Sequence, residues 1–262
     1  MNQQVDIKLN DSVATIVIDR ADACNALNAS LIHQLIEAFG DIHQEKKVTA
    51  VVLIGRGDHF CSGVDLKEFA KITSLDPMDA HPEWFDAWQQ LTDLCETLLR
   101  FPKPIIAAID GAAIGAGLAI ALSCDLMVLS QRAKLVANAA HRGLIGGLTA
   151  PLLEFRFGAA IAARLLLSGD AIDSEEAYRL GMCCETASVD QIWVQANDLA
   201  KRCGQAPRES VQATKRILNE AIGETLLTNL AGGAATAATL CNTESASEGI
   251  NSFVDKREPQ WP

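Results

Sequence analysis

The segment 110–125, DGAAIGAGLAIALSCD, decides the fold that the sequence predicts. An apolar run at 105–109 precedes it and indicates a buried strand that ends in a turn at Asp110-Gly111. Gly115 and Gly117 then lead into a small, apolar stretch that is compatible with a buried helix. The pattern therefore predicts a strand, a glycine-rich bend and a helix N-terminus, where backbone N–H groups lack partners within the helix.

Unpaired N–H groups at the positive end of a helix dipole can hold a phosphate or the oxygen of a polarised carbonyl. The segment is not a phosphate loop of the nucleotide-hydrolase kind, because no Gly-Lys-Ser/Thr follows it. It is not a dinucleotide-binding fingerprint either, because Gly115-Ala116-Gly117 lacks the third glycine. Tight packing of a helix on a sheet stays open as the alternative explanation of these glycines.

A second segment, 59–68, has the sequence HFCSGVDLKE and follows an apolar strand pattern at 50–54. It also passes through a turn of small residues into a predicted helix. Two turns of this kind can direct two backbone N–H groups at one oxygen atom. The pair is typical of a site that stabilises negative charge on a carbonyl oxygen.

Segments spread in order over nearly the whole chain resemble the motifs of the crotonase superfamily, which includes the enoyl-CoA hydratases and isomerases. They are DR at 19–20, NAL at 25–27, FCSGVDLKE at 60–68, KPIIAAIDG at 103–111, AIGAGLAIALSCDL at 113–126, and EGINSFVDKR at 248–257. Ala21 stands where the family's N-terminal motif has proline.

The resemblance implies an α/β fold, a crotonase-like spiral of ββα units with a C-terminal helical trimerisation region. The spiral core is expected over residues 1–200 and the helical region over 201–262. The resemblance also implies self-association, as a homotrimer or a dimer of trimers. The expected ligand is an acyl-CoA thioester whose enolate is held by the N–H groups of Val64 and Ala116. No cofactor is expected beyond the coenzyme A that is part of the substrate.

The same resemblance assigns a set of residues to substrate binding. The adenosine end of coenzyme A is expected against residues 23–25 and 61–66, and two C-terminal residues are expected to help from a neighbouring subunit. The full set comprises Ala23, Asn25, Cys61, Ser62, Asp65, Leu66, Gly115, Ala139, Arg142, Phe253 and Lys256. For Lys256, a solvated surface lysine is the alternative.

Two acid/base groups of the family are missing from this sequence. Hydratases of the family use two glutamates, and alanine occupies both matching positions, Ala119 and Ala139. The usual acid of the isomerases shares the second position. Ordinary addition of water to an enoyl-CoA therefore lacks both expected groups. His141 is a candidate for proton transfer and Arg142 for binding a substrate carboxylate, although exposed loop positions would also explain both.

Three functions stay open. The first is an enzyme that stabilises an enolate with non-standard acid/base groups, such as a decarboxylase, an isomerase or a lyase. The second is a hydratase whose acids come from unexpected positions. The third is a binding or scaffold protein of the family with no turnover.

Composition narrows the class of protein further. The net charge of −11 argues against nucleic acid or an anionic membrane as the main partner. No run of about 18 apolar residues occurs, so no membrane span is expected. The eight cysteines include no Cys-x-x-Cys pair and the five histidines are dispersed, which predicts reduced thiols in a cytoplasmic protein and no metal site.

Periodicity places the remaining elements. A hairpin is expected around Asn10-Asp11, and helices at 29–43 and 65–72. We expect a loop over 73–82, because it contains two prolines, and then a long helix over 84–99. Helices dominate the predicted structure after residue 150.

Overall fold

The structure is a computed structural model, and it describes residues 3–221 and 224–262. Its main sheet has the strand order β1-β2-β3-β4-β6-β9 in the described part of the chain. The strands are β1 (Val5–Asn10), β2 (Val13–Ile18), β3 (Ala50–Gly55), β4 (Ile105–Ile109), β6 (Leu126–Ser130) and β9 (Glu185–Ala187). β1 and β2 form the predicted antiparallel hairpin, and all the other pairs in this sheet are parallel.

A second, smaller sheet carries the glycine-rich bend. Its order is β5-β7-β8, formed by β5 (Ala112–Ile114), β7 (Lys134–Val136) and β8 (Ile172–Asp173). β5 pairs with β7 in parallel and β7 with β8 antiparallel. The chain thus moves from the main sheet to the small sheet at Asp110-Gly111, directly before the bend.

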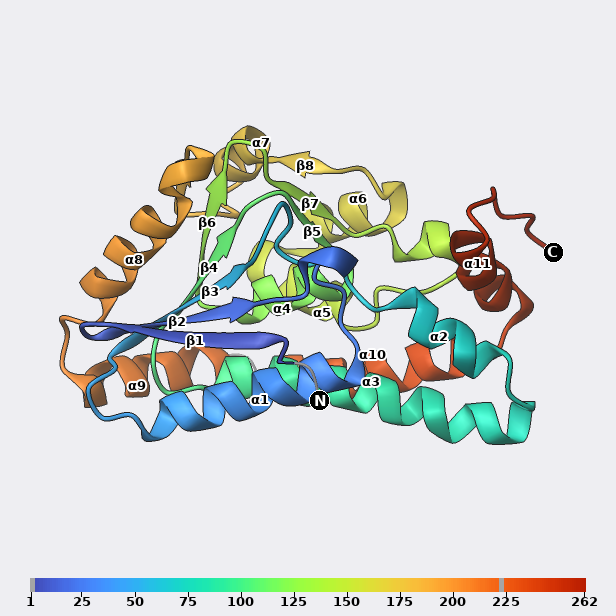
Figure 1. The fold of residues 1–262 in the computed structure, drawn as a ribbon, viewed down its shortest axis with the longest axis horizontal. Coiled ribbons are helices and arrows are strands. Elements are labelled where there is room, and N and C mark those ends of the chain that lie inside the picture. The colour runs from blue at the N-terminus through green and yellow to red at the C-terminus, as the bar shows by residue number, and fades with distance from the viewer. Residues whose placement is uncertain (1–2, 222–223) are drawn as a thin grey trace.

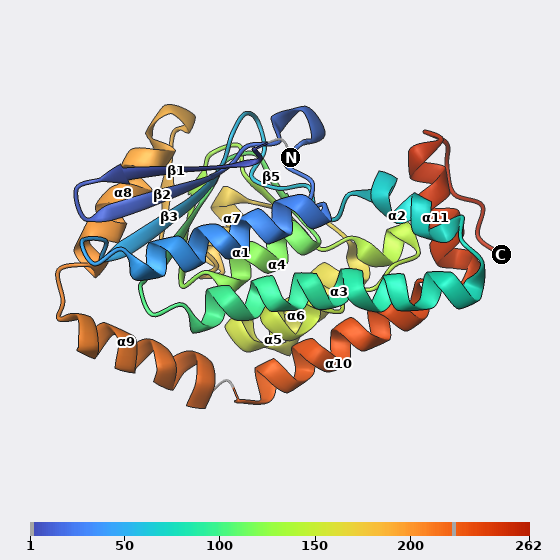
Figure 2. The ribbon, with the colours of Figure 1, turned by 60° about the horizontal axis from the view of Figure 1, so that its bottom comes forward.

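Helices surround both sheets (Figures 1 and 2). The α-helices of the described residues are α1 (Ala29–Gln44), α2 (Leu66–Thr73), α3 (Pro77–Arg100), α4 (Ala116–Ser123), α5 (Thr149–Phe157), α6 (Ala159–Ser168), α7 (Ser174–Arg179), α8 (Ile192–Cys203), α9 (Arg208–Arg216), α10 (Glu224–Leu240) and α11 (Glu244–Val254). Short turns of other helix types are η1 (Ala21–Ala23), η2 (Ala139–Arg142), η3 (Val189–Gln191) and η4 (Ile217–Ala221).

Alternation along the strands divides the apolar side chains between two layers. In β3, Val51 and Leu53 join the large core, whereas Val52 packs in a separate cluster with Ala196 and Ala200 of α8. Both faces of a parallel strand are buried in this arrangement, which explains its continuous apolar sequence. The sheet therefore lies between α8 on one face and the large helical core on the other (Figure 1).

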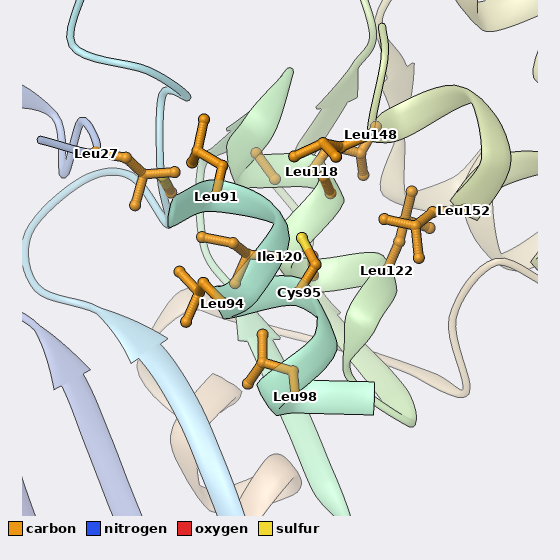
Figure 3. Close-up of a cluster of buried hydrophobic side chains, with 14 of the residues drawn as sticks. Leu27, Leu91, Leu94, Cys95, Leu98, Leu118, Ile120, Leu122, Leu148 and Leu152 are labelled. Atoms are coloured by element: carbon orange, nitrogen blue, oxygen red, sulfur yellow. The ribbon is translucent and has the colours of Figure 1, made fainter. Parts of the chain in front are cut away.

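The helix that follows the glycine-rich bend lies at the centre of the large core. Every residue of α4 from Gly117 to Ser123 is buried. Leucines of α3 pack against α4, and Leu148 and Leu152 cover another side of it (Figure 3). A helix that is apolar all round needs such burial on every side. The core thus fixes the position of the bend at Gly115.

The loop expected over 73–82 is confirmed only at 74–76, because α2 ends at Thr73 and α3 begins at Pro77 and contains Pro82. Proline is tolerated at the first helical position, where no N–H is needed, and Pro82 in the second turn gives up only one backbone hydrogen bond. The N–H groups of Asp79 and Ala80 both donate to the Asp76 carbonyl. Burial of Trp84 further along α3 favours the helix over the loop.

The C-terminal helices pack onto the rest of the same chain. α10 runs along α3, and α11 packs against α2 and η2 (Figure 2). A buried ion pair anchors α9, since Lys215 Nζ lies 2.7 Å from Asp125 Oδ2 and donates to the Lys103 carbonyl at 2.9 Å. Burial lowers the pKa of the Lys215 ammonium, and Asp125 opposes this. The carboxylate also accepts from the Ile105 N–H, at 2.8 Å.

Lys215→Met should destabilise the protein by about 3–5 kcal/mol, the usual cost of leaving one member of a buried ion pair without its partner. The partly buried Asp125 carboxylate, which is 19% exposed, would lose its neutralising charge, which methionine cannot replace. Urea unfolding measures the effect. Lys201→Met is the matched control, because its pair with Asp11 is exposed and should contribute less than about 1 kcal/mol. Equal stabilities for the two variants would contradict this role of Lys215.

Candidate functional site

Backbone pairing holds the two predicted turns against each other. The Cys61 N–H donates to the Ala112 carbonyl at 3.1 Å, and the Ile114 N–H donates to the Cys61 carbonyl at 3.0 Å. Gly63 has φ +94°, and a Cβ on it would lie 2.7 Å from the Ile114 oxygen and 3.5 Å from the Ala116 nitrogen. Only glycine allows this approach, which brings the turn before α2 next to the start of α4.

One backbone N–H on each turn has no acceptor in the described chain. Leu27 pairs with the residues on both sides of Val64, donating to the Gly63 carbonyl and accepting from Asp65, so the Val64 N–H is directed away from Leu27. The first helical bond of α4 runs from Ala119 to Gly115, which leaves Ala116 N–H outside the helix ladder. Neither N–H donates a hydrogen bond within residues 3–221 and 224–262.

Both turns line a cavity of about 420 Å³. Its other walls come from η1, from Trp88 of α3, from residues 138–149 and from α11. Many residues singled out from the sequence lie in its wall: Ala23, Ser62, Val64, Asp65, Leu66, Gly115, Ala116, Ala139, Arg142 and Phe253. The fold thus brings together segments that are far apart in the sequence.

Two predicted binding residues support the turns from behind instead of lining the cavity. Asn25 is fully buried; its Oδ1 accepts from the Arg20 N–H, and its Nδ2 donates to the carbonyls of Arg56 and His59. Cys61 is also fully buried, and burial raises the pKa of its thiol to about 12. Cys61 therefore contributes its backbone, and its protonated thiol is no nucleophile at neutral pH.

His141 and Lys256 also lie outside the cavity wall. The His141 ring packs beside Gly169, where an added Cβ would lie 2.6 Å from its Nδ1. Phe253 lines the cavity of its own chain, whereas the sequence led us to expect this residue to act from a neighbouring subunit. The Arg142 guanidinium lies over the Phe253 ring, 5.3 Å from its centroid.

A short tail contact holds the helix that carries Phe253. Arg257 makes two hydrogen bonds to the Glu248 carboxylate, at 2.6 and 2.8 Å, and the Gln260 N–H donates to it as well. The Arg257 guanidinium lowers the pKa of Glu248 to about 2. The tail is therefore charged and paired with α11 at neutral pH.

The charged groups of the cavity wall are not arranged as an acid/base pair. Asp65 lies 2.6 Å from the Arg20 guanidinium and accepts from the Lys67 N–H as the N-cap of α2, so its carboxylate is already occupied. Lys67 and Arg142 form no ion pair with any described residue. These two cations are available to a negatively charged ligand.

The structure also places the two alanines that the resemblance matches to the family's glutamates. Ala119 is fully buried within α4, and Ala139 lies in the cavity wall, half-buried. Asp22 and Asp65 are the acidic residues in the wall formed by the described chain. No group of three or more His, Cys, Asp or Glu among these residues is placed to hold a metal ion.

Sequence reasoning missed the apolar side of the cavity, which consists of Trp88, Ile114, Leu144, Ile145 and Leu148. Trp88 has helical spacing with other core residues, so its pattern resembles that of any buried tryptophan. Thr149, whose hydroxyl donates to the Gly115 carbonyl at 3.2 Å, was also missed. No local motif marks these positions.

Comparisons with known proteins find relatives that match nearly the whole chain. The family model for enoyl-CoA hydratase/isomerase matches residues 8–262. A probable enoyl-CoA hydratase of Mycobacterium leprae is 30% identical over 250 residues, covering 95% of this chain and 94% of the relative. The 1,2-epoxyphenylacetyl-CoA isomerase of Escherichia coli is 28% identical over 253 residues, with 95% and 94% coverage.

Solved structures give the same fold. An enoyl-CoA hydratase/isomerase from Pseudoalteromonas atlantica superposes with a TM-score of 0.85 and 25% identity, covering 99% of this chain and 100% of the other. An enoyl-CoA hydratase from Bacillus halodurans has a TM-score of 0.86 at 24% identity, with 95% and 100% coverage. The α/β crotonase fold predicted from the sequence is confirmed. No helix within the described residues is both long and apolar enough to span a bilayer.

Proposed function

This chain belongs to the enoyl-CoA hydratase/isomerase family, and from that premise we propose that it holds the thioester carbonyl of an acyl-CoA between two backbone N–H groups. The donors are those of Val64 and Ala116. The observation that carries the proposal is that both N–H groups lack an acceptor in the described chain and belong to residues in the wall of one cavity. A carbonyl oxygen that gains charge as an enolate forms is stabilised by such preorganised donors.

The charged and apolar residues of the cavity wall support one orientation of a bound acyl-CoA. The turn at Ala23 and the segment Ser62–Lys67 would take the adenosine and phosphate end, where Lys67 forms no ion pair with a described residue. Arg142, which also forms none with the described residues, would bind a carboxylate of the substrate. The apolar side near Leu148 would take the acyl group. No cofactor is needed beyond the coenzyme A of the substrate itself.

The reaction we propose is one that proceeds through a thioester enolate without the two glutamates of the hydratases, such as isomerisation or a lyase reaction. Alanine at 119 and 139 removes the groups that would add water to a double bond. His141 lies outside the cavity wall, so the proton carrier is assigned to bound water or to the substrate's own groups. A family member that binds acyl-CoA without turnover is the second candidate, and alanine at both positions 119 and 139 favours it.

Self-association into a homotrimer or a dimer of trimers is part of the proposal. Large apolar side chains stay exposed on the C-terminal region, including Ile217 at 56% and Leu218 at 51% exposure. Such residues commonly mark surfaces between subunits. The cysteines of the described chain are all unpaired, which fits the reducing environment of the cytoplasm.

Titration calorimetry with acetyl-CoA, crotonyl-CoA and free coenzyme A tests the proposal. We expect binding with a Kd on the order of micromolar, about −8 kcal/mol. Absence of heat and of a thermal shift with every thioester would refute it. Exchange of the thioester α-protons with deuterated water, followed by NMR, then separates the two candidates, because an enolate-forming enzyme exchanges them and a binding protein does not.

A further inference from the structure

Trp88 lines the cavity, and Phe69, whose ring it touches, lines a second cavity. The second cavity has a volume of about 310 Å³ and is bounded by α1, α2 and α3. Phe69 and Ala87 line the second cavity, whereas Trp88 lines the first. The rings of Phe69 and Trp88 meet edge to face with centroids 6.1 Å apart. The two rings are therefore part of the wall between the cavities.

Contacts on several sides fix the Trp88 ring. It is only 5% exposed, and its Nε1–H donates to the Cys241 Sγ at 3.5 Å. Phe69, which it touches, is held in turn by Trp84, with centroids 5.0 Å apart. An aromatic ring with these contacts is a rigid wall, because tight interior packing leaves little room for another rotamer.

The position of α3, which carries Trp88, relates this ring to the proposed path of the acyl group. The blue turn with Ala23 and the helix α3 lie on opposite sides of the segment that leads into α2 in both ribbon views (Figures 1 and 2). With the adenosine end against Ala23 and the carbonyl at Val64, as in the proposed function on which this inference rests, the acyl chain points toward α3. Besides Trp88, the apolar residues Ile114, Leu144, Ile145 and Leu148 line this cavity.

We infer that Trp88 limits the length of the acyl group, so that the protein selects short, apolar acyl-CoA thioesters. A longer chain would meet the face of the indole ring and would have to displace it from Phe69 and Cys241. Leu27, Ile32 and Ile72 give the second cavity an apolar part, beside charged groups such as those of Glu68 and Asp86. A smaller residue at 88 would open the space up to the Phe69 ring and admit a longer chain.

Calorimetry with acetyl-, butyryl-, hexanoyl-, octanoyl-, decanoyl- and palmitoyl-CoA tests the inference on the wild-type protein. Affinity is expected to fall by at least about tenfold beyond a certain length, the change that one misfitting methylene produces in a hydrophobic pocket. Trp88→Ala should shift the chain length at which the affinity falls toward longer acyl groups. Trp88→Leu should shift that length by less. Each variant's circular dichroism and oligomer size are recorded alongside.

Trp84→Leu is the matched control. Trp84 lies one helical turn before Trp88, meets the same Phe69 ring edge to face and lines neither cavity. The Trp84→Leu variant should lose a comparable amount of packing and keep the same preferred length of the acyl group. The inference would be overturned if folded Trp88→Leu protein lost affinity at the same acyl length as the wild type, or if the wild type bound all lengths equally. Either result would leave the proposed function intact. Absence of binding by every thioester would instead overturn the proposed function.

Discussion

Ala116→Pro is expected to lower enolate formation by about 10²–10³-fold, the cost of removing one donor from an oxyanion-binding site. Proline has no backbone N–H, so the substitution deletes the donor. Ala116 is the first residue of α4, the position where proline is tolerated best in a helix. The exchange of thioester α-protons with deuterated water, measured by NMR, gives the rate.

Ala116→Ser is the matched control for that experiment. It changes the side chain in the cavity wall and keeps the N–H, so it should retain most of the exchange. Gly115, which precedes the substituted residue, has φ +53°, and circular dichroism must show that α4 still forms in the proline variant. Full exchange by folded Ala116→Pro protein would remove Ala116 N–H from the mechanism.

The fold could be predicted from the sequence where the pattern is local. The apolar runs at 50–54 and 105–109 are strands of the main sheet, and the small, apolar segment after Gly117 is a buried helix. The start of α3 could not be predicted, because Pro77 and Pro82 indicate a loop locally. Tertiary burial of Trp84 outweighs that preference.

The candidate site could be predicted only in part, for a similar reason. The turns at Gly63 and Gly115 contain glycines with a positive φ. Glycine-rich turns of this kind can be recognised in a sequence, because glycine adopts such a φ without steric cost. Trp88 has no such signal, because its role depends on which cavity its helix faces. His141 has a suitable side chain for proton transfer, but its position in η2 directs it toward Gly169.

Hydration of crotonyl-CoA by this protein should be slower by several orders of magnitude than in a family member with both glutamates. Each general acid–base group contributes about 10²–10⁴-fold, and both are alanine here. Loss of thioester absorbance, checked by mass spectrometry of the product, measures the rate. Rapid hydration by the unmodified protein would show that other groups in the cavity transfer the protons.

Ala139→Glu should raise the hydration rate by about 10²–10⁴-fold over that low level. Ala139 lies in the cavity wall and is half-buried, so a carboxylate at this position can reach the cavity without being enclosed in the core. Ala139→Gln is the control, because the amide has nearly the same shape and cannot transfer a proton. Equal rates for the two variants would contradict the acid/base explanation.

Ala119→Glu should behave differently, although the resemblance matches both positions to glutamates of the family. Ala119 is fully buried in α4, and its carbonyl already accepts from the Ser123 hydroxyl at 2.9 Å. A carboxylate enclosed there would lose its hydration and would be retained only in its neutral form, which cannot act as a base. Thermal unfolding should show a lower Tm for Ala119→Glu than for Ala139→Glu. A stable Ala119→Glu protein that hydrates crotonyl-CoA would mean that the cavity opens toward α4 when a thioester binds.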